Sequence, residues 1–378
     1  MGLAPSSRES LQSLLERLAG PMKLAIDEGR SRVRCVACGH RCLIPPGAVG
    51  VCKVRFNRDG ALYGPRGYVA GLQDDPIEKK PFFHALPGTR ALSFGMLGCD
   101  FHCGYCQNWV TSQALRDEAA GARPQSISAE EIVVHAKAVG AHTLTSTYNE
   151  PLITAEWAEE VFRLGRNAGL LLSFVSNGNN TPEVIDFLRP HLDLCKIDLK
   201  GFDDARYRKL GGTLRNVLEG IERVHRAGIW MELVTLLVPG FNDGDAELRA
   251  LTGFIADLSP DIPWHVTAFH PDYRMTEGSG TTAADLLRAA GIGRAAGLRY
   301  IYTGNLPGRV GEGESTRCPN CGDMLVERMG FAVTDYRLRG GRCPRCEADI
   351  PGVWHPGDAS PTTEGQGAGW VRRVVVQS

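Results

Sequence analysis

The chain has 378 residues, 43% of them hydrophobic and 22% charged, and its 42 Lys and Arg against 43 Asp and Glu leave a formal net charge of −1. These values are typical of a globular protein and give no electrostatic reason to expect a nucleic-acid or membrane partner. The N-terminal residues show no apolar segment with a cleavage site, and no run of about 18 apolar residues occurs. We therefore expect no signal peptide, no transmembrane helix and a cytoplasmic location.

The chain contains twelve cysteines, and all but Cys195 fall into three groups. The groups are Cys35, Cys38, Cys42 and Cys52, then Cys99, Cys103 and Cys106, and finally Cys318, Cys321, Cys343 and Cys346. Clustered cysteines in a cytosolic chain of this size indicate metal or redox sites, whereas disulfide frameworks belong to small secreted proteins. We expect Cys195 to be a small buried hydrophobic residue.

The pattern of residues divides the chain into four segments. Residues 1–88 form a cysteine-rich N-terminal extension, irregular apart from a short amphipathic helix over residues 10–18. Residues 89–305 alternate strand-like and helical patterns, and residues 306–355 form a zinc-ribbon-like C-terminal module. The tail, residues 356–378, is rich in Gly, Ser and Thr, which is typical of a mobile end.

The first cysteine group has the pattern CxxCxxxC followed by Cys52, and His40 inside it could replace a cysteine. Four thiolates at this spacing suit structural zinc, and they also suit an auxiliary [4Fe–4S] cluster that passes electrons to a catalytic one. Pro45, Pro46 and the nearby glycines favour a closed zinc knuckle. The prediction is zinc or an auxiliary cluster, with zinc preferred.

Short apolar, β-branched runs predict strands in the middle segment at 91–96, 143–148, 170–175, 194–199, 230–238, 264–269 and 299–302. One helical pattern opens at Ser128, with Glu131 completing a capping box. Other helical patterns cover 154–168, 182–188, 214–227, 246–258 and 281–296. Because such alternation produces a parallel sheet, we predict an α/β fold: a partial βα barrel of about six parallel strands.

Polar residues follow the predicted strands one after another. The loop with Cys99, Cys103 and Cys106 follows the first strand. The later strands are followed by Asn149–Glu150–Pro151, Ser176–Asn177–Gly178, Asp198 with Lys200, Pro239–Gly240–Phe241–Asn242, His270, and Gly304–Asn305. In a βα barrel, active-site groups gather at the C-terminal ends of the strands. The sequence therefore predicts an active rim built around a metal loop.

The second cysteine group lies in the segment GCDFHCGYCQNW, a CxxxCxxC pattern. Three thiolates on one loop can each bind one iron of a [4Fe–4S] cluster and leave the fourth iron without a protein ligand. That iron can bind the amino and carboxylate groups of S-adenosylmethionine (SAM), whose one-electron cleavage yields a 5′-deoxyadenosyl radical. The alternative is a zinc site in which a residue such as His102 supplies the fourth ligand.

Several motifs give the chain a family resemblance. The CxxxCxxC pattern with Tyr105 before its last cysteine resembles the signature of the radical SAM superfamily. The match is collinear over about residues 22–355, through DPIEKKPFFHALPG, CQNW, STYNEP, CKIDLKG, VPGFND and YTGN. Together these segments resemble the radical SAM component of the AmmeMemoRadiSam system, a relative of the pyruvate formate-lyase activating enzymes.

The resemblance implies cofactor-binding roles at the matching motifs. Glu150 would help to hold the methionine amino group, with Asn149 next to it, and Tyr105 would lie against the adenine. The methionine and ribose ends would be contacted by Ser176, Asp198, Lys200 and His270. The relatives carry GGEP where this chain has TYNEP, so the close backbone approach that two glycines permit is altered at Asn149. Without the resemblance, Asp198 with Lys200 could be a rim ion pair, and His270 could cap a strand end.

The third cysteine group consists of two CxxC pairs, 318–321 and 343–346. Two such pairs resemble a zinc ribbon, in which a structural ion with four thiolate ligands lets a small segment fold. A second iron–sulfur cluster is the alternative. The GxGxxA pattern at 291–296 matches a dinucleotide fingerprint, but it lies in a helical pattern with no strand before it, so we discard it.

The sequence leads to three functional hypotheses. The first is a radical SAM enzyme that abstracts a hydrogen atom from an unknown substrate, which could be a protein. The resemblance implies Memo-like and AMMECR-like proteins as partners and flavodoxin or ferredoxin as electron donor. The second hypothesis specifies activation of a glycyl-radical enzyme. The third is a metal-binding scaffold or redox sensor without catalysis, against which the row of polar rim residues argues.

Overall fold

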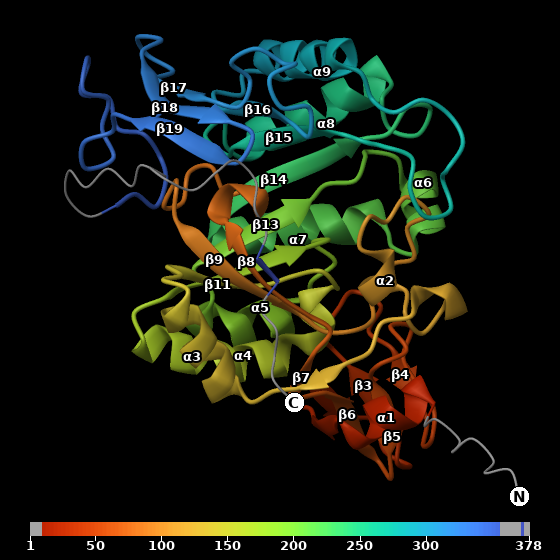
Figure 1. The fold of residues 1–378 in the computed structure, drawn as a ribbon. Coiled ribbons are helices and arrows are strands. Elements are labelled where there is room, and N and C mark those ends of the chain that lie inside the picture. Colours follow the sequence, from red (N-terminus) through yellow and green to blue (C-terminus); the bar gives the residue numbers. More distant parts are fainter. Residues whose placement is uncertain (1–9, 356–371, 374–378) are drawn as a thin grey trace, which may run out of the picture.

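A computed structural model describes residues 10–355 and 372–373 of the chain. Its main feature is a nine-stranded sheet in the order β16-β15-β14-β13-β12-β11-β9-β8-β20 (Figure 1). Seven neighbouring strands run parallel: β9 (Arg90–Gly95), β11 (Thr143–Ser146), β12 (Leu171–Ser176), β13 (Leu194–Asp198), β14 (Trp230–Leu237), β15 (Trp264–Ala268) and β16 (Ile301–Gly304). The predicted parallel α/β fold is confirmed, with seven parallel strands instead of about six.

The sheet is open, because the two ends of the parallel set, β9 and β16, do not pair with each other. On the β9 side, β8 (Gly71–Pro76) and β20 (Arg372–Arg373) add two antiparallel strands. The structure is therefore a partial barrel, as predicted. The rest of the tail, residues 356–371 and 374–378, on which the prediction of a mobile end falls, lies outside the described residues.

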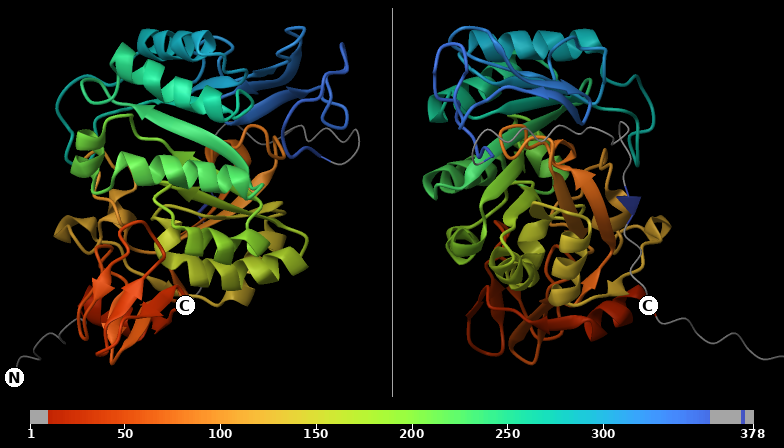
Figure 2. Two further views of the ribbon diagram at one scale, coloured as in Figure 1. Left: turned by 180° about the vertical axis from the view of Figure 1, so that it is seen from behind. Right: turned by 60° about the vertical axis from the view of Figure 1, so that its left-hand side comes forward.

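Helices connect the parallel strands and cover one face of the sheet (Figure 2). They are α3 (Ala129–Ala138), α4 (Ala155–Asn167), α5 (Pro182–Leu188), α7 (Leu214–Arg226), α8 (Asp245–Leu258) and α9 (Ala283–Ala295), all within the predicted ranges or one residue of them. In α7, Val217, Ile221 and Val224 are buried at helical spacing and form part of the main core. The predicted capping box of Ser128 and Glu131 is present at the start of α3.

The N-terminal extension is not irregular, so that prediction was wrong. It contains α1 (Leu11–Arg17) and two small antiparallel sheets. One consists of β1 (Ala19–Pro21), β6 (Ala61–Pro65) and β5 (Phe56–Arg58), and the other of β2 (Ala25–Asp27), β3 (Val33–Cys35) and β4 (Leu43–Ile44). A single pair joins β7 (Tyr68–Val69) to β10 (Gln125–Ser126). Strands of two or three residues are too short to show a period of two in the sequence.

The C-terminal module is a small sheet of β17 (Thr316–Arg317), β18 (Met324–Met329) and β19 (Ala332–Tyr336) with a hydrophobic cluster of its own. That cluster includes Leu325, Val326 and Val333 from the module, and Phe83 and Tyr302 from outside it. The module is thus packed against the barrel strand β16 and against the N-terminal extension. No helix in the described part of the chain is both long and apolar enough to cross a membrane.

Candidate active site

The loop that carries Cys99, Cys103 and Cys106 begins where β9 ends and leads into the short helix α2 (Trp109–Ser112). Cys103 is buried, and the other two thiols are half-buried. Burial raises the pKa of Cys103 to about 12, although Lys200 acts in the opposite direction. Burial also raises the pKa of Cys99 and of Cys106, so a metal ion that binds here must displace three protons.

Asp100 fixes the conformation of this loop. Its carboxylate is fully buried and accepts hydrogen bonds from the side-chain amides of Asn177 at 2.7 Å and Asn179 at 2.8 Å. The two asparagines follow β12, so they tie the cysteine loop to a strand two places along the sheet. The sequence contained one hint of this role, because Asn177 belongs to a polar cluster at a strand end; Asp100 carried no signal beyond its position between two cysteines.

A cavity of about 350 Å³ opens beside the loop. Among the sequence-predicted residues, Cys103, Tyr105, Cys106, Asp198 and Lys200 line it. The ring of Tyr105 is buried and packs edge-on against Phe241 at a centroid distance of 5.5 Å. The structure thus brings residues of the loop and of β13 together around one space, at the C-terminal ends of the parallel strands.

Asp198 lies between two ammonium groups on the cavity wall. It accepts from Lys200 Nζ at 3.2 Å and also from Lys196 Nζ. Burial alone would raise the pKa of Asp198, but the two lysines lower it to about 2. Asp198 and Lys200 therefore form the ion pair considered from the sequence, and this pair faces the cavity. Lys196 was missed, although it occupies the same face of β13 as Asp198 two residues earlier.

Glu150, Ser176 and Asn149 lie next to the loop but not on the cavity wall. The buried carboxylate of Glu150 accepts from Ser176 Oγ at 2.7 Å, from the backbone N–H of Asn177 at 2.8 Å and from that of Leu152 at 3.1 Å. Burial, and then the charge of Asp100, raise the pKa of Glu150 to about 8. The Asn149 side chain accepts from the backbone N–H of Met96 at 2.9 Å and so ties its turn to the end of β9.

Tyr148 belongs to the TYNEP segment that replaces GGEP of the relatives, and its backbone shows the effect of this difference. This residue has a φ of +68°, a conformation that glycine adopts easily and tyrosine rarely does. Its ring lines the cavity, and its hydroxyl donates to Asp75 at 2.7 Å. Lys80 contacts the same hydroxyl at 3.0 Å and is itself nearly fully buried. The segment that precedes the barrel therefore contributes a further cationic group to the cavity.

Further residues on the wall were not predicted as site residues. Lys79, Lys80, Lys196 and Asn305 belong to motifs that carried the family resemblance, and that was the available signal. Phe331 had no signal, because it comes from the turn between β18 and β19 in the C-terminal module. His270 is exposed, and its Nδ1 lies 3.4 Å from the carbonyl of Pro271, so it lies outside the cavity wall.

The C-terminal cysteines come together in the structure. The sulfur atoms of Cys318, Cys321, Cys343 and Cys346 all lie within 4.8 Å of one another. Two pairs, Cys318 with Cys346 and Cys321 with Cys343, are 3.6 Å apart. Hydrogen bonds, first from the backbone of Ala348 and then from Asn320, lower the pKa of Cys346 to about 6. This group has the donor set and the compactness of a site for one metal ion.

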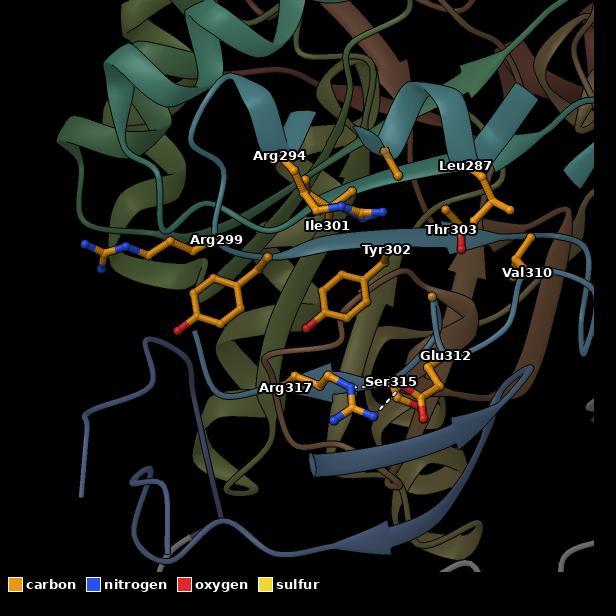
Figure 3. Close-up of a pocket in the computed structure, with 13 residues that line it drawn as sticks. Leu287, Arg294, Arg299, Ile301, Tyr302, Thr303, Val310, Glu312, Ser315 and Arg317 are labelled. Carbon is orange, nitrogen blue, oxygen red and sulfur yellow. Dashed lines mark hydrogen bonds and ion pairs between the residues drawn. The ribbon is translucent and has the colours of Figure 1, made fainter. Parts of the chain in front are cut away.

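A second cavity, of about 370 Å³, lies between α9, β16 and residues 310–317 (Figure 3). Three arginines line it, and two of them are already paired: Arg299 with Asp261 at 3.0 Å and Arg317 with Glu312 at 3.0 Å. No cysteine and none of the predicted cofactor-binding residues lines this cavity. The cavity at the cysteine loop is therefore the candidate active site.

The residues at the cysteine loop fit an iron–sulfur cluster better than a zinc ion. In the described part of the chain, only the C-terminal cysteines form a group compact enough for a single ion. His102, the alternative fourth ligand of a zinc ion, is exposed. Its ring packs against Gly211, where a β-carbon would lie 3.3 Å from it. The cavity wall carries two of the three thiols and no histidine. Three protein thiolates leave one corner of a cubane cluster open to a ligand in the cavity.

Comparison with known proteins adds an independent finding. The model of the Radical SAM superfamily matches residues 95–251. An uncharacterized protein of Methanocaldococcus jannaschii is 36% identical over 324 residues, which cover 85% of this chain and 95% of that protein. The pyruvate formate-lyase-activating enzyme of Staphylococcus epidermidis is 26% identical over 49% of this chain and 76% of that protein. The crystal structure of a radical SAM methyltransferase from Sphaerobacter thermophilus aligns with a TM-score of 0.45 and 16% identity, over 63% of this chain and 71% of that one.

Proposed function

Because the chain belongs to the radical SAM superfamily, we propose that it binds a [4Fe–4S] cluster through Cys99, Cys103 and Cys106 and cleaves SAM reductively. The observation that carries this proposal is the shared cavity. Two of the three loop thiols, Tyr105 and the Asp198–Lys200 pair all border the same space at the C-terminal ends of the strands. Membership of the superfamily implies the cluster and SAM, whereas the individual residue roles are our proposal.

A bound cluster supplies the electron that splits SAM into methionine and a 5′-deoxyadenosyl radical, which takes a hydrogen atom from the substrate. The chain's own residues bind and orient. Tyr105 presents a rigid aromatic wall for the adenine, and the charges of Asp198 and Lys200 bind the polar ribose and methionine ends. Glu150 neighbours Cys99 and, with Ser176, is proposed to serve the methionine amino group, with Asn149 fixing that turn. His270, the remaining predicted contact, lies outside the cavity wall and is the weakest of these assignments.

We further propose that the chain is the radical SAM component of an AmmeMemoRadiSam system. The collinear motifs support this proposal. It makes Memo-like and AMMECR-like proteins the partners to test, with flavodoxin or ferredoxin as electron donor. The similarity to a pyruvate formate-lyase-activating enzyme supports activation of a glycyl-radical enzyme as the second candidate reaction.

The compact C-terminal cysteine group supports structural zinc there. A scaffold without catalysis would not need a cavity lined by a half-buried carboxylate and four lysines.

Production of 5′-deoxyadenosine tests the proposed function. The protein is loaded anaerobically with iron and sulfide, given SAM and a strong reductant, and assayed by mass spectrometry. We expect product from the wild-type protein and none from the variant C99A/C103A/C106A. The matched control is Cys195→Ala, which removes a buried thiol of β13 that lies outside all three groups and should retain activity. No product from cluster-loaded wild-type protein would sink the proposal.

The choice of reaction needs a second experiment. The active protein is incubated with SAM, reductant and either a candidate glycyl-radical enzyme or the Memo-like and AMMECR-like proteins. A glycyl doublet in the electron paramagnetic resonance (EPR) spectrum of the candidate enzyme would establish activation. SAM cleavage that rises only with the Memo-like or AMMECR-like protein, without a doublet, would instead support the AmmeMemoRadiSam assignment.

A further inference from the structure

The N-terminal cysteines have a different spacing from the C-terminal ones. A zinc ion binds four thiolates tetrahedrally at about 2.3 Å, which places the sulfur atoms about 3.8 Å apart. The C-terminal sulfurs meet this requirement, with two pairs at 3.6 Å. Among the described residues, no three sulfurs of Cys35, Cys38, Cys42 and Cys52 come within 4.8 Å of one another. The three sulfurs of the cysteine loop do not form such a compact group either. An iron–sulfur cluster does not need its thiolates to lie so close together, because each thiolate binds a different iron.

The four N-terminal thiols nevertheless face a common region. Cys35, Cys38 and Cys52 are buried and Cys42 is half-buried. The Cys35 N–H donates to the Cys42 carbonyl at 2.9 Å, and a β-carbon on Gly50, two residues before Cys52, would lie 3.6 Å from Cys42 Sγ. The group is therefore a converging ligand set and not a scatter of buried cysteines.

The surroundings supply further contacts to the sulfur atoms. The guanidinium of Arg55 is fully buried and lies 3.7 Å from Cys35 Sγ, while its other contacts are the Glu156 carboxylate and the carbonyl of Ile153 at 2.7 Å. The backbone N–H of Val51 donates to Cys42 Sγ at 3.5 Å. Hydrogen bonds and charge around the sulfurs are what set the reduction potential of an iron–sulfur cluster.

The N-terminal cysteine group also adjoins the cysteine loop of the candidate active site. A β-carbon on Gly98 would lie 3.1 Å from the carbonyl oxygen of Cys52, so the two segments are in direct contact. Arg116 joins them, donating to the carbonyls of Cys99 at 2.8 Å and Val51 at 2.6 Å. The N-terminal group and the cysteine loop are therefore in contact through backbone atoms and the Arg116 side chain.

We propose that Cys35, Cys38, Cys42 and Cys52 hold a second iron–sulfur cluster, not zinc, and that it relays an electron to the cluster at the neighbouring loop. A donor of the ferredoxin or flavodoxin class gives up one electron, the N-terminal cluster takes it up, and the same electron then passes to the neighbouring cluster. The relay rests on the proposed function, whereas the metal content of the N-terminal group does not.

The variant C99A/C103A/C106A isolates the N-terminal group and is purified without oxygen and reconstituted with iron and sulfide. We expect about four irons and four sulfides per chain, a visible absorption band and an EPR signal after reduction. Zinc content should correspond to the C-terminal group alone. Retention of zinc at two sites, with no iron, would overturn the proposal. This result does not depend on SAM cleavage, so it is separate from the test of the proposed function.

Two further measurements complete the experiment. In the otherwise wild-type protein, changing the four N-terminal cysteines to serine should halve the iron content, while Cys195→Ala should leave it unchanged. If the serine variant does not fold, the variant that lacks the loop cysteines still decides the metal content. In the reduced wild-type protein, two clusters held by these adjoining segments should broaden each other's EPR signals; two unperturbed signals would overturn the relay.

Discussion

At the scale of single residues, two carboxylates organise the candidate site, one on the cavity wall and one beside the cysteine loop. Asp198 bonds two lysines, and Glu150 bonds one side chain and two backbone N–H groups. Residues that end a strand could be predicted as site residues, because the C-terminal ends of parallel strands meet. Asp100 could not, because its partners Asn177 and Asn179 are distant in the sequence. Lys196 could not, because nothing in the sequence marks a buried lysine within a strand as the partner of Asp198.

Asp198→Asn should weaken SAM binding by about tenfold or more, equivalent to about 1.4 kcal/mol. The change removes the negative charge shared by Lys196 and Lys200 and leaves one buried and one half-buried ammonium group without it. Equilibrium dialysis of cluster-loaded protein with radiolabelled SAM measures the effect. Asp193→Asn, just before the opposite end of the same strand, is the matched control and should bind SAM normally. Equal affinity in both variants would remove Asp198 from the proposed site.

At the scale of elements, all seven parallel strands and the long helices could be predicted from periodicity, because each repeats its pattern over several residues. Two short helices, α2 and α6 (Asp204–Leu210), and the strands of the N-terminal extension could not. β8 was hidden for another reason: it contains Asp74, Asp75 and Pro76, which are typical of turns. Those aspartates form ion pairs with Arg90, Lys79 and Lys80, contacts that the sequence does not show.

Gly95→Ala should destabilise the protein and impair the site together. A β-carbon there would lie 2.4 Å from the carbonyl oxygen of Thr147, so the turn that carries Tyr148 and Glu150 must shift. Overpacking of this kind typically costs about 1–3 kcal/mol. Gly253→Ala in α8 is the control, since nothing lies within 4 Å and alanine favours a helix by up to about 1 kcal/mol. Urea unfolding should show opposite signs for the two variants; the same sign would contradict the packing at Gly95.

At the scale of the whole molecule, a buried polar network ties the three segments together at the end of the sheet opposite the cysteine loop. Glu232 accepts from the backbone N–H groups of Phe83 and His84 and from His265. His84 also contacts the carbonyl of Pro351 at 2.7 Å and the Tyr302 hydroxyl at 2.6 Å. Because a carbonyl only accepts, Nδ1 of His84 donates to Pro351 and Nε2 accepts from Tyr302. These partners are far apart in the sequence, so no local pattern predicts them.

His84 should make stability depend on pH. Burial lowers its pKa to about 4, so between pH 6.5 and 4 the unfolded chain takes up a proton that the folded chain does not. This stability is complete above pH 6.5 and is lost as the pH falls toward 4. The advantage of wild type over His84→Gln should therefore shrink by about 1 kcal/mol between pH 7.5 and 5.5, as measured by urea unfolding. Exposed His225, replaced in the same way, should show no such trend.

The turn between β18 and β19 brings a residue of the C-terminal module to the cavity. Phe331 reaches the cavity wall from this turn, where Gly330 has a φ of +59° and the neighbouring Met329 is 64% exposed. The turn lies well beyond residues 95–251, the stretch shared with the wider superfamily. Mutations in the turn can reshape the cavity wall without changing any cysteine. Substrate selectivity can therefore change through mutations in this turn while the cysteine loop stays the same.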